Sequence, residues 1–223
     1  DFKGAIFDLD GVVVDTVPLH FKAWKKMFGE QGKDFTFEDY KAKVDGIPRV
    51  DGARAVLTEL DESGLEKAAA RKQEYFLELL KTDGIKVYDT TIDLIKELRS
   101  RGIKIAVISS SRSCSFILKE TGLLQILDAV ISGGDIIEGK GKPDPWIFLS
   151  AMAQLGLKPE ECVVFEDAVF GVEAGKNAKM KTVGVDRHKD PIRLMKADLV
   201  VTDLDELSYN KLKSLIEGKK EKR

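Results

Sequence analysis

Short apolar runs alternate with longer amphipathic stretches over most of this 223-residue chain. Six of the runs, rich in β-branched residues, have the length of buried strands: 4–7, 103–108, 129–131, 163–165, 182–185 and 199–201. Stretches of helical length lie between them, among them 91–101, 114–121, 145–155 and 169–178. Because strands that alternate with helices form parallel sheets, the pattern predicts a doubly wound α/β fold.

The segment 17–82 interrupts this alternation. Its apolar residues repeat at helical spacing, as Phe21, Trp24 and Phe28 do, and no run within it predicts a strand. Thr16 can cap the first helix of the segment, and Pro18 is tolerated in its first turn. We therefore expect a helical cap at 17–82 that is inserted after the first strand and covers its end. The α/β core would consist of 1–16 and 83–223.

Composition and charge exclude several classes of protein. Apolar residues make up 43% of the chain, enough for a sizeable core, and 36 basic against 38 acidic side chains give no field that favours nucleic acid or a membrane. We find neither a membrane span nor a signal peptide. We expect a cytoplasmic protein in which Cys114 and Cys162 are reduced packing residues, and in which the charged tail 219–223 is a frayed helix end.

Asp8 and Asp10 follow the first predicted strand in the sequence FDLDG. Residues i and i+2 of a strand point to one side, and α/β sheets bind ligands beyond the carboxyl ends of their strands. Two carboxylates so close repel each other unless a cation lies between them or one keeps its proton, which favours a phosphoryl-transfer site. An EF-hand calcium loop is excluded because Val12 and Val13 occupy its fifth and sixth positions.

Two further predicted strands also end in polar residues. The strand 103–108 is followed by three serines and Arg112, which could bind an anion or, taken alone, only cap a helix. The strand 163–165 is followed by Glu166 and Asp167, whose oxygens suit Mg²⁺, although Asp167 alone could cap the next helix. With Asp8 and Asp10, these strand ends predict one metal–phosphate site.

Lys142 lies in Gly141-Lys142-Pro143-Asp144-Pro145, where prolines restrict the backbone ahead of a predicted helix. Its ammonium group could offset the charge of the carboxylates and of a transferring phosphate. The alternative is that Lys142 is exposed to solvent, as most lone lysines are. A P-loop is only partly matched nearby, because Gly141 replaces the Ser or Thr that such a loop needs for Mg²⁺. An ATPase is therefore a weak hypothesis.

In order and spacing, the stretches FDLDG, ISSS, KPDP and FED resemble the four motifs of the haloacid dehalogenase superfamily, over a span from Phe7 to about Asp186. Within it the chain is most similar to the β-phosphoglucomutase-like group. The similarity lies in Asp15-Thr16 followed by 20–24, in Gly46-Ile47-Pro48-Arg49, and in Arg71-Lys72-Gln73. The resemblance implies a Rossmann-like core with a helical cap that faces the substrate.

The resemblance also implies a role for each matching residue. Asp8 would be the nucleophile that becomes an aspartyl phosphate, and Asp10 would be the acid/base. Ser109 and Lys142 would hold the phosphoryl group. Mg²⁺ would be bound by Asp8, the backbone carbonyl of Asp10, Glu166 and Asp167. The sugar and its other phosphate would be bound by Thr16, His20, Trp24, Gly46, Ile47, Arg49, Lys72, Ser110, Ser111 and Arg112.

The expected activity is that of a monomeric, Mg²⁺-dependent mutase that converts β-glucose 1-phosphate to glucose 6-phosphate. The chain departs from the group's pattern at three places. Gln73 stands where the group commonly has Asn, Arg112 stands where a close mutase has Lys, and Asp89-Thr90 stands where Pro-Gly is usual after the cap. The alternative is therefore a hexose-phosphate phosphatase, which would discharge the aspartyl phosphate to water. A non-catalytic sugar-phosphate-binding protein would be expected to lose Asp8 or Asp10, and both are present.

Overall fold

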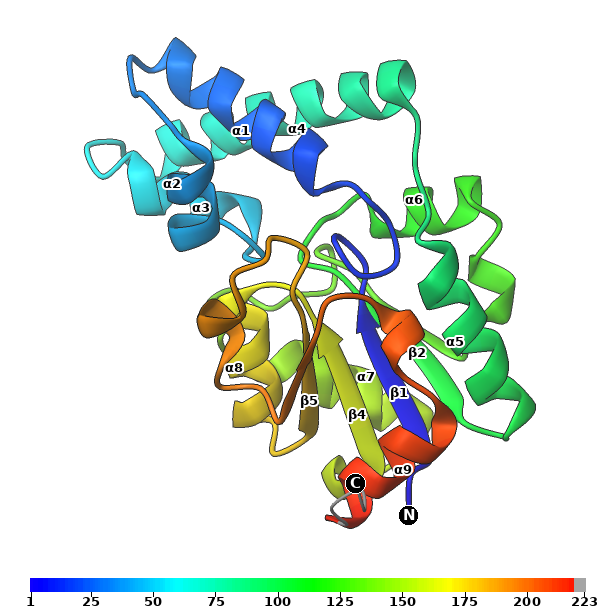
Figure 1. Ribbon diagram of the computed structural model, residues 1–223. Helices are drawn as coiled ribbons and strands as arrows, with labels where there is room; N and C mark the ends of the chain where they lie inside the picture. The colour runs from blue at the N-terminus through cyan, green and yellow to red at the C-terminus, as the bar shows by residue number, and fades with distance from the viewer. Residues whose placement is uncertain (219–223) are drawn as a thin grey trace.

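Residues 1–218, the part of the chain that the computed structural model describes, contain a six-stranded parallel sheet (Figure 1). The strand order is β3-β2-β1-β4-β5-β6, so the direction of winding reverses between β1 and β4. Ligands of such sheets bind at this switch point, beyond the carboxyl ends of the strands. The strands are β1 (Gly4–Asp8), β2 (Lys104–Ile108), β3 (Ala129–Ile131), β4 (Cys162–Glu166), β5 (Lys181–Val185) and β6 (Leu199–Val201). Each predicted strand and the doubly wound fold are confirmed.

The two central strands, β1 and β4, are buried along their whole length. Successive side chains of a strand point to opposite faces, so Phe7 and Ile6 enter two different apolar clusters. Phe7 stacks on Phe165 with ring centroids 4.3 Å apart, while Ile6 belongs to the cluster that contains Ile147 and Phe148 of α7 (Trp146–Leu155). Apolar packing on both faces fixes the central strands and therefore the residues at their ends.

Four helices lie between β1 and α5 (Asp89–Ser100), as the helical spacing of 17–82 predicts. They are α1 (Val17–Glu30), α2 (Phe37–Lys43), α3 (Arg49–Val56) and α4 (Glu62–Asp83). Figure 1 shows them as a separate layer beyond the carboxyl ends of β1 and β4. We call α1 to α4 and their connecting loops the cap. The division of the chain at 16/17 and 82/83 stays a prediction, and α4 continues to Asp83.

The first turn of α1 differs from expectation at Thr16. Thr16 occupies the N-cap position, but its side chain makes no capping hydrogen bond. Instead its hydroxyl donates to Oδ1 of Asp10 at 2.5 Å, because a carboxylate is a strong, charged acceptor. Pro18 lies in the first turn, as predicted.

The remaining helices cover the core. They are α6 (Cys114–Glu120), α8 (Val169–Asn177) and α9 (Tyr209–Glu217), together with the short 3₁₀ helices η1 (Leu124–Ile126), η2 (Pro159–Glu161), η3 (Pro191–Leu194) and η4 (Leu204–Glu206). Helix α9 was not predicted, and the expected frayed tail 219–223 lies outside the described residues. Cys114 and Cys162 are both free and buried, as expected of packing residues. Within residues 1–218, none of the helices combines the length and the apolar character needed to span a bilayer.

Candidate active site

Three carboxylates meet at the switch point of the sheet. Asp8 ends β1, Glu166 ends the neighbouring β4, and Asp167 follows it. One oxygen of each lies within 4.8 Å of the others, and all three side chains are buried. Burial and the nearby charge of Glu166 raise the pKa of Asp8 well above its usual value, and burial with the charges of Asp45 and Glu166 does the same for the pKa of Asp167. A divalent cation with oxygen ligands would relieve this repulsion.

The cluster has the features expected of a cation site. Oδ2 of Asp167 is buried and has no hydrogen-bond partner among the described residues. Two glycines leave room for the carboxylates: a Cβ atom on Gly11 would lie 2.0 Å from Asp167 Oδ2, and one on Gly171 would lie 2.0 Å from Oε1 of Glu166. The residues present therefore fit a hard cation such as Mg²⁺.

Lys142 is buried beside this cluster. Its Nζ lies 2.7 Å from Oδ1 of Asp8, and it also contacts Oε1 of Glu166. Burial alone would lower the pKa of Lys142, but the charges of Asp8 and Glu166 outweigh it and raise that pKa. The alternative of a solvated lysine is therefore wrong for Lys142.

Asp10 lies outside the three-carboxylate cluster and is held as an anion by three donors. Its Oδ1 accepts from Thr16 and from Nε2 of His20, at 2.5 and 2.8 Å, and its Oδ2 accepts from Oγ of Ser109 at 2.8 Å. Burial would raise the pKa of Asp10, but the interaction with His20 and the hydrogen bonds lower it. Ser109 is not a helix cap, since the N-cap of α6 is Ser113.

A chain of hydrogen bonds joins Asp10 to the cap. Nζ of Lys72, on α4, lies 2.8 Å from Nδ1 of His20, on α1. An ammonium group can only donate, so Nδ1 of His20 accepts and Nε2 carries the proton that His20 donates to Asp10. Burial lowers the pKa of Lys72 to about 7, and burial together with the charge of Lys72 lowers the pKa of His20. The chain of hydrogen bonds therefore runs from Lys72 through His20 to the carboxylate of Asp10.

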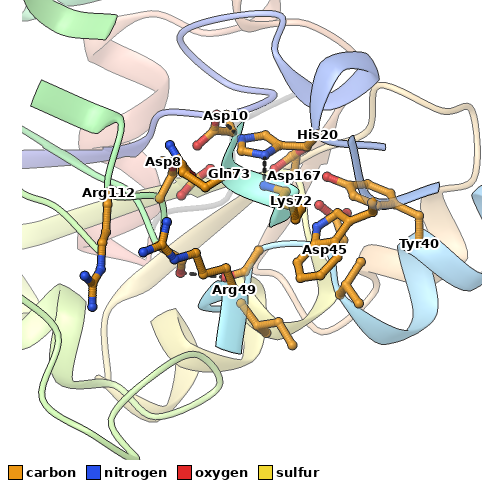
Figure 2. A pocket seen from close by; sticks show the side chains of 16 residues that line it. Asp8, Asp10, His20, Tyr40, Asp45, Arg49, Lys72, Gln73, Arg112 and Asp167 are labelled. Carbon is orange, nitrogen blue, oxygen red and sulfur yellow. Dashed lines mark hydrogen bonds and ion pairs between the residues drawn. The ribbon is translucent and has the colours of Figure 1, made fainter. Parts of the chain in front are cut away.

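A cavity of about 50 Å³ separates the cap from the carboxyl end of the sheet. Figure 2 shows side chains from both parts of the chain converging on it. It is lined by three predicted catalytic or metal-binding residues, Asp8, Asp10 and Asp167, and by nine predicted sugar-binding residues: His20, Trp24, Gly46, Ile47, Arg49, Lys72, Ser110, Ser111 and Arg112. Thr16, Ser109, Lys142 and Glu166 do not line the cavity, but each contacts Asp10 or Asp8, or lies in the carboxylate cluster.

Arg49 and Arg112 form the cationic side of the cavity. Within residues 1–218 neither makes an ion pair, and Nε of Arg49 is buried with no hydrogen-bond partner. Burial and the repulsion of Arg112 lower the pKa of Arg49. Two guanidinium groups that make no ion pair suit a bound anion, and phosphate matches their geometry.

Comparison with known proteins identifies the family. Residues 2–179 match the model of the haloacid dehalogenase-like hydrolases, which covers more than half of the chain. The chain belongs to this family. The predicted membership of the haloacid dehalogenase superfamily is thus confirmed, and the four motif stretches lie within the matched region.

The relatives place this haloacid dehalogenase-like protein near the β-phosphoglucomutases. A β-phosphoglucomutase of Mycobacterium bovis is 36% identical, over 92% of this chain and 91% of that protein. The crystal structure of β-phosphoglucomutase from Clostridium difficile superposes with a TM-score of 0.87 at 27% identity, over 98% of each chain. A phosphorylated carbohydrates phosphatase of Thermotoga maritima is 32% identical, over 81% of this chain and 83% of that protein. The predicted similarity to the β-phosphoglucomutase-like group is confirmed.

Sequence reasoning missed several residues of the site in this haloacid dehalogenase-like chain. Tyr40, Val44, Asp45 and Gln73 line the cavity but were not among the predicted site residues. Asp45 is hydrogen-bonded to Tyr40, and burial raises the pKa of Asp45 to about 7. Its position directly before the Gly46–Arg49 stretch was a usable signal, because neighbours of a binding loop often line the same cavity.

Proposed function

We propose that this protein is a β-phosphoglucomutase, which uses Mg²⁺ and an aspartyl phosphate on Asp8 to convert β-glucose 1-phosphate to glucose 6-phosphate. The relatives with that name support the substrate class. The observation that carries the proposal is the pair Arg49 and Arg112 in the same cavity as Asp8 and Asp10. A mutase handles a sugar bisphosphate, so it needs cations for the phosphate that is not reacting as well as a nucleophile for the one that is.

Asp8 would attack the phosphorus atom of the bisphosphate. A bond forms between a carboxylate oxygen of Asp8 and phosphorus, while the bond between phosphorus and the sugar oxygen breaks. Lys142, already paired with Asp8, would offset the negative charge of the phosphoryl group, with Ser109 beside it. Asp8, the backbone carbonyl of Asp10, Glu166 and Asp167 would hold Mg²⁺, which when bound neutralises charge on the phosphoryl oxygens.

Asp10 would transfer the proton. As a base it takes the proton from the sugar hydroxyl that attacks the aspartyl phosphate, and as an acid it returns a proton to the sugar oxygen that leaves when Asp8 attacks the other phosphate. The proton balance therefore closes within one cycle. The donors Thr16, His20 and Ser109 hold the carboxylate of Asp10 between these two steps.

The cap would bind the remote end of the substrate. Arg49 and Lys72 come from α3 and α4, whereas Arg112 belongs to the core, so a phosphate between them would be bound from both sides. The cavity of about 50 Å³ shares Arg49, Ser110 and Arg112 with a neighbouring cavity of about 450 Å³, which would receive the remote end of a hexose phosphate.

The test is the product formed from β-glucose 1-phosphate with Mg²⁺ and a trace of glucose 1,6-bisphosphate. We expect glucose 6-phosphate from the wild type and no turnover from Asp8→Asn, whose amide cannot form the acyl phosphate. Arg49→Ala should lower isomerisation about ten- to a hundredfold, the range for one lost charge-assisted contact. Arg54→Ala is the matched control, because Arg54 lies on the same helix but pairs with Asp51 and Glu62 at the surface.

A hexose-phosphate phosphatase is the alternative, favoured by the similarity to the Thermotoga maritima phosphatase and by Gln73 in place of the usual Asn. Free glucose and inorganic phosphate as the main products, at a rate that Arg49→Ala leaves unchanged, would establish it instead. In both cases we propose a monomeric cytoplasmic enzyme with a sugar-phosphate substrate.

A further inference from the structure

The loop 44–48, between α2 and α3, is one of the parts of the cap that contact the core around the cavity; His20 and Gln73 contact it through Asp10 and Ser113. Oγ of Ser110, in the core, donates to the carbonyl oxygen of Gly46 at 2.8 Å. A Cβ atom on Gly46 would lie 3.0 Å from Cβ of Ala168, and one on Gly141 would lie 2.6 Å from Cγ of Pro48. Cap and core therefore meet here at van der Waals distance. We call residues 44–48 the docking loop.

The docking loop carries one buried carboxyl group, that of Asp45, which faces a buried arginine of the core. Oδ2 of Asp45 lies 3.7 Å from Nη1 of Arg193, and the two side chains are only 5% and 11% exposed. Arg193 belongs to η3, far from the motifs of the site along the chain. Among the Lys and Arg ion pairs of residues 1–218, this is the one that joins the cap to the core.

The same arginine also reaches the carboxylate cluster. Nη2 of Arg193 donates to the backbone carbonyl of Asp167 at 3.1 Å. Its Nη1 and Nε, and Oδ2 of Asp45, have no hydrogen-bond partner in the described part of the chain. Asp45 and Arg193 therefore compensate each other mainly by charge, and neither makes another ion pair in the described part of the chain.

We propose that Asp45 and Arg193 are positioning residues that hold the docking loop on the core and so decide whether the aspartyl phosphate is discharged to a sugar hydroxyl or to water. The inference rests on the proposed mutase function. When the loop is seated, Asp45, Gly46 and Ile47 line the cavity and close it on the side of the cap. A closed, dry site favours the bound hydroxyl over solvent.

The competing step has a definite chemistry. A water oxygen attacks the phosphorus of the aspartyl phosphate, the bond between Asp8 and phosphorus breaks, and Asp10 takes the proton, so that inorganic phosphate and free enzyme are formed. In productive turnover the sugar hydroxyl takes the place of that water. The ratio of inorganic phosphate to glucose 6-phosphate therefore reports how well the docking loop excludes water.

Variants that remove one charge each test the pair. We expect Asp45→Asn and Arg193→Gln each to raise the ratio of inorganic phosphate to glucose 6-phosphate about tenfold or more. The double variant should raise it no further, because residues that act as a pair are not additive. The matched control is Glu173→Gln, which removes a partly exposed ion pair with Lys196 that lies within the core, next to η3. Its ratio should equal that of the wild type.

A second measurement needs no turnover. In small-angle scattering of the full chain without substrate, Asp45→Asn and Arg193→Gln should give a larger radius of gyration than wild type and Glu173→Gln, at unchanged far-UV circular dichroism. Exchanging the charges in Asp45→Arg/Arg193→Asp should restore the compact form more than either of its single variants does. Unchanged product ratio and radius in folded single variants, or additive effects in the double variant, would overturn the proposal.

Failure of the proposed function gives a different result. A wild type that releases only inorganic phosphate refutes the mutase, yet the scattering of the variants still tests the pair. A wild type that makes glucose 6-phosphate, with variants that keep its product ratio, refutes the pair alone.

Discussion

The ammonium group of Lys142 lies 2.7 Å from Oδ1 of Asp8, and both side chains are almost fully buried. Glu166 is the second partner of Lys142. The cation is therefore part of the fold as well as of the site, because two buried carboxylates depend on it for their compensation.

Replacing Lys142 should cost stability. Removing one partner of a buried ion pair typically costs about 3–5 kcal/mol, since it leaves an uncompensated charge. We expect a loss of this order in the free energy of unfolding of Lys142→Met, measured by urea denaturation without Mg²⁺. Lys140→Met is the control: Lys140 is half-exposed, and its surface pair with Asp144 should contribute less than about 1 kcal/mol. Equal stability of the two variants would contradict the role of Lys142.

Gly171 should tolerate no side chain, although it lies in the helix α8. Alanine favours helices over glycine by up to about 1 kcal/mol, but here its Cβ would meet the carboxyl group of Glu166 at 2.0 Å. We expect Gly171→Ala to lower both the melting temperature and the affinity for Mg²⁺. Gly29→Ala in α1 should raise the melting temperature, because nothing lies within 4 Å of its Cβ position. Isothermal titration calorimetry and thermal melts would show the contrast; similar results for the two variants would argue against it.

Mg²⁺ should stabilise the protein more at pH 8 than at pH 5. The pKa values of Asp8 and Asp167 are raised above 3.8 in the metal-free fold, so between the unfolded and folded pKa values the native state binds more protons. Its stability therefore falls as the pH rises through that interval, and the metal ion must displace protons to bind. Thermal melts with Mg²⁺ or EDTA at both pH values measure the effect, and Asp167→Asn should abolish most of it. A shift independent of pH would be inconsistent with this cluster as the site.

Asp10 should affect rate without affecting metal binding, because its side chain lies outside the carboxylate cluster. General acid/base catalysis contributes roughly 10²- to 10⁴-fold, so Asp10→Ala should lower turnover by that order. The Mg²⁺-dependent rise in melting temperature should persist and serves as the control for an intact site. Wild-type turnover in Asp10→Ala would mean that another group transfers the proton.

The elements whose pattern is local could be predicted from the sequence. The six strands follow from β-branched runs buried on both faces, and the motifs at their ends predicted which polar residues would meet at the sheet's edge. The amphipathic helix α9 was missed because it is short, and within its nine residues only Leu212, Leu215 and Ile216 repeat at helical spacing.

What could not be predicted depends on contacts between distant segments. Thr16 was expected to cap a helix, but the carboxylate of Asp10 competes for its hydroxyl. Arg193 carries no local sign that it lies against Asp45, because that contact forms only when the cap folds over the core. Lys142 was recognisable as part of a motif, yet its buried contacts with Asp8 and Glu166 form only when the ends of β1 and β4 lie side by side.

The position of the cavity between cap and core has a consequence for the order of events in a turnover. Asp8 lies on the core side of the cavity and residues of the cap close the opposite side, so we expect the two phosphates of a bisphosphate to exchange places while the cap is lifted. Each catalytic cycle would then include an interval in which the intermediate is exposed to bulk solvent. An excess of unlabelled glucose 1,6-bisphosphate should dilute isotope carried from labelled β-glucose 1-phosphate into glucose 6-phosphate, in proportion to the fraction of intermediates that escape.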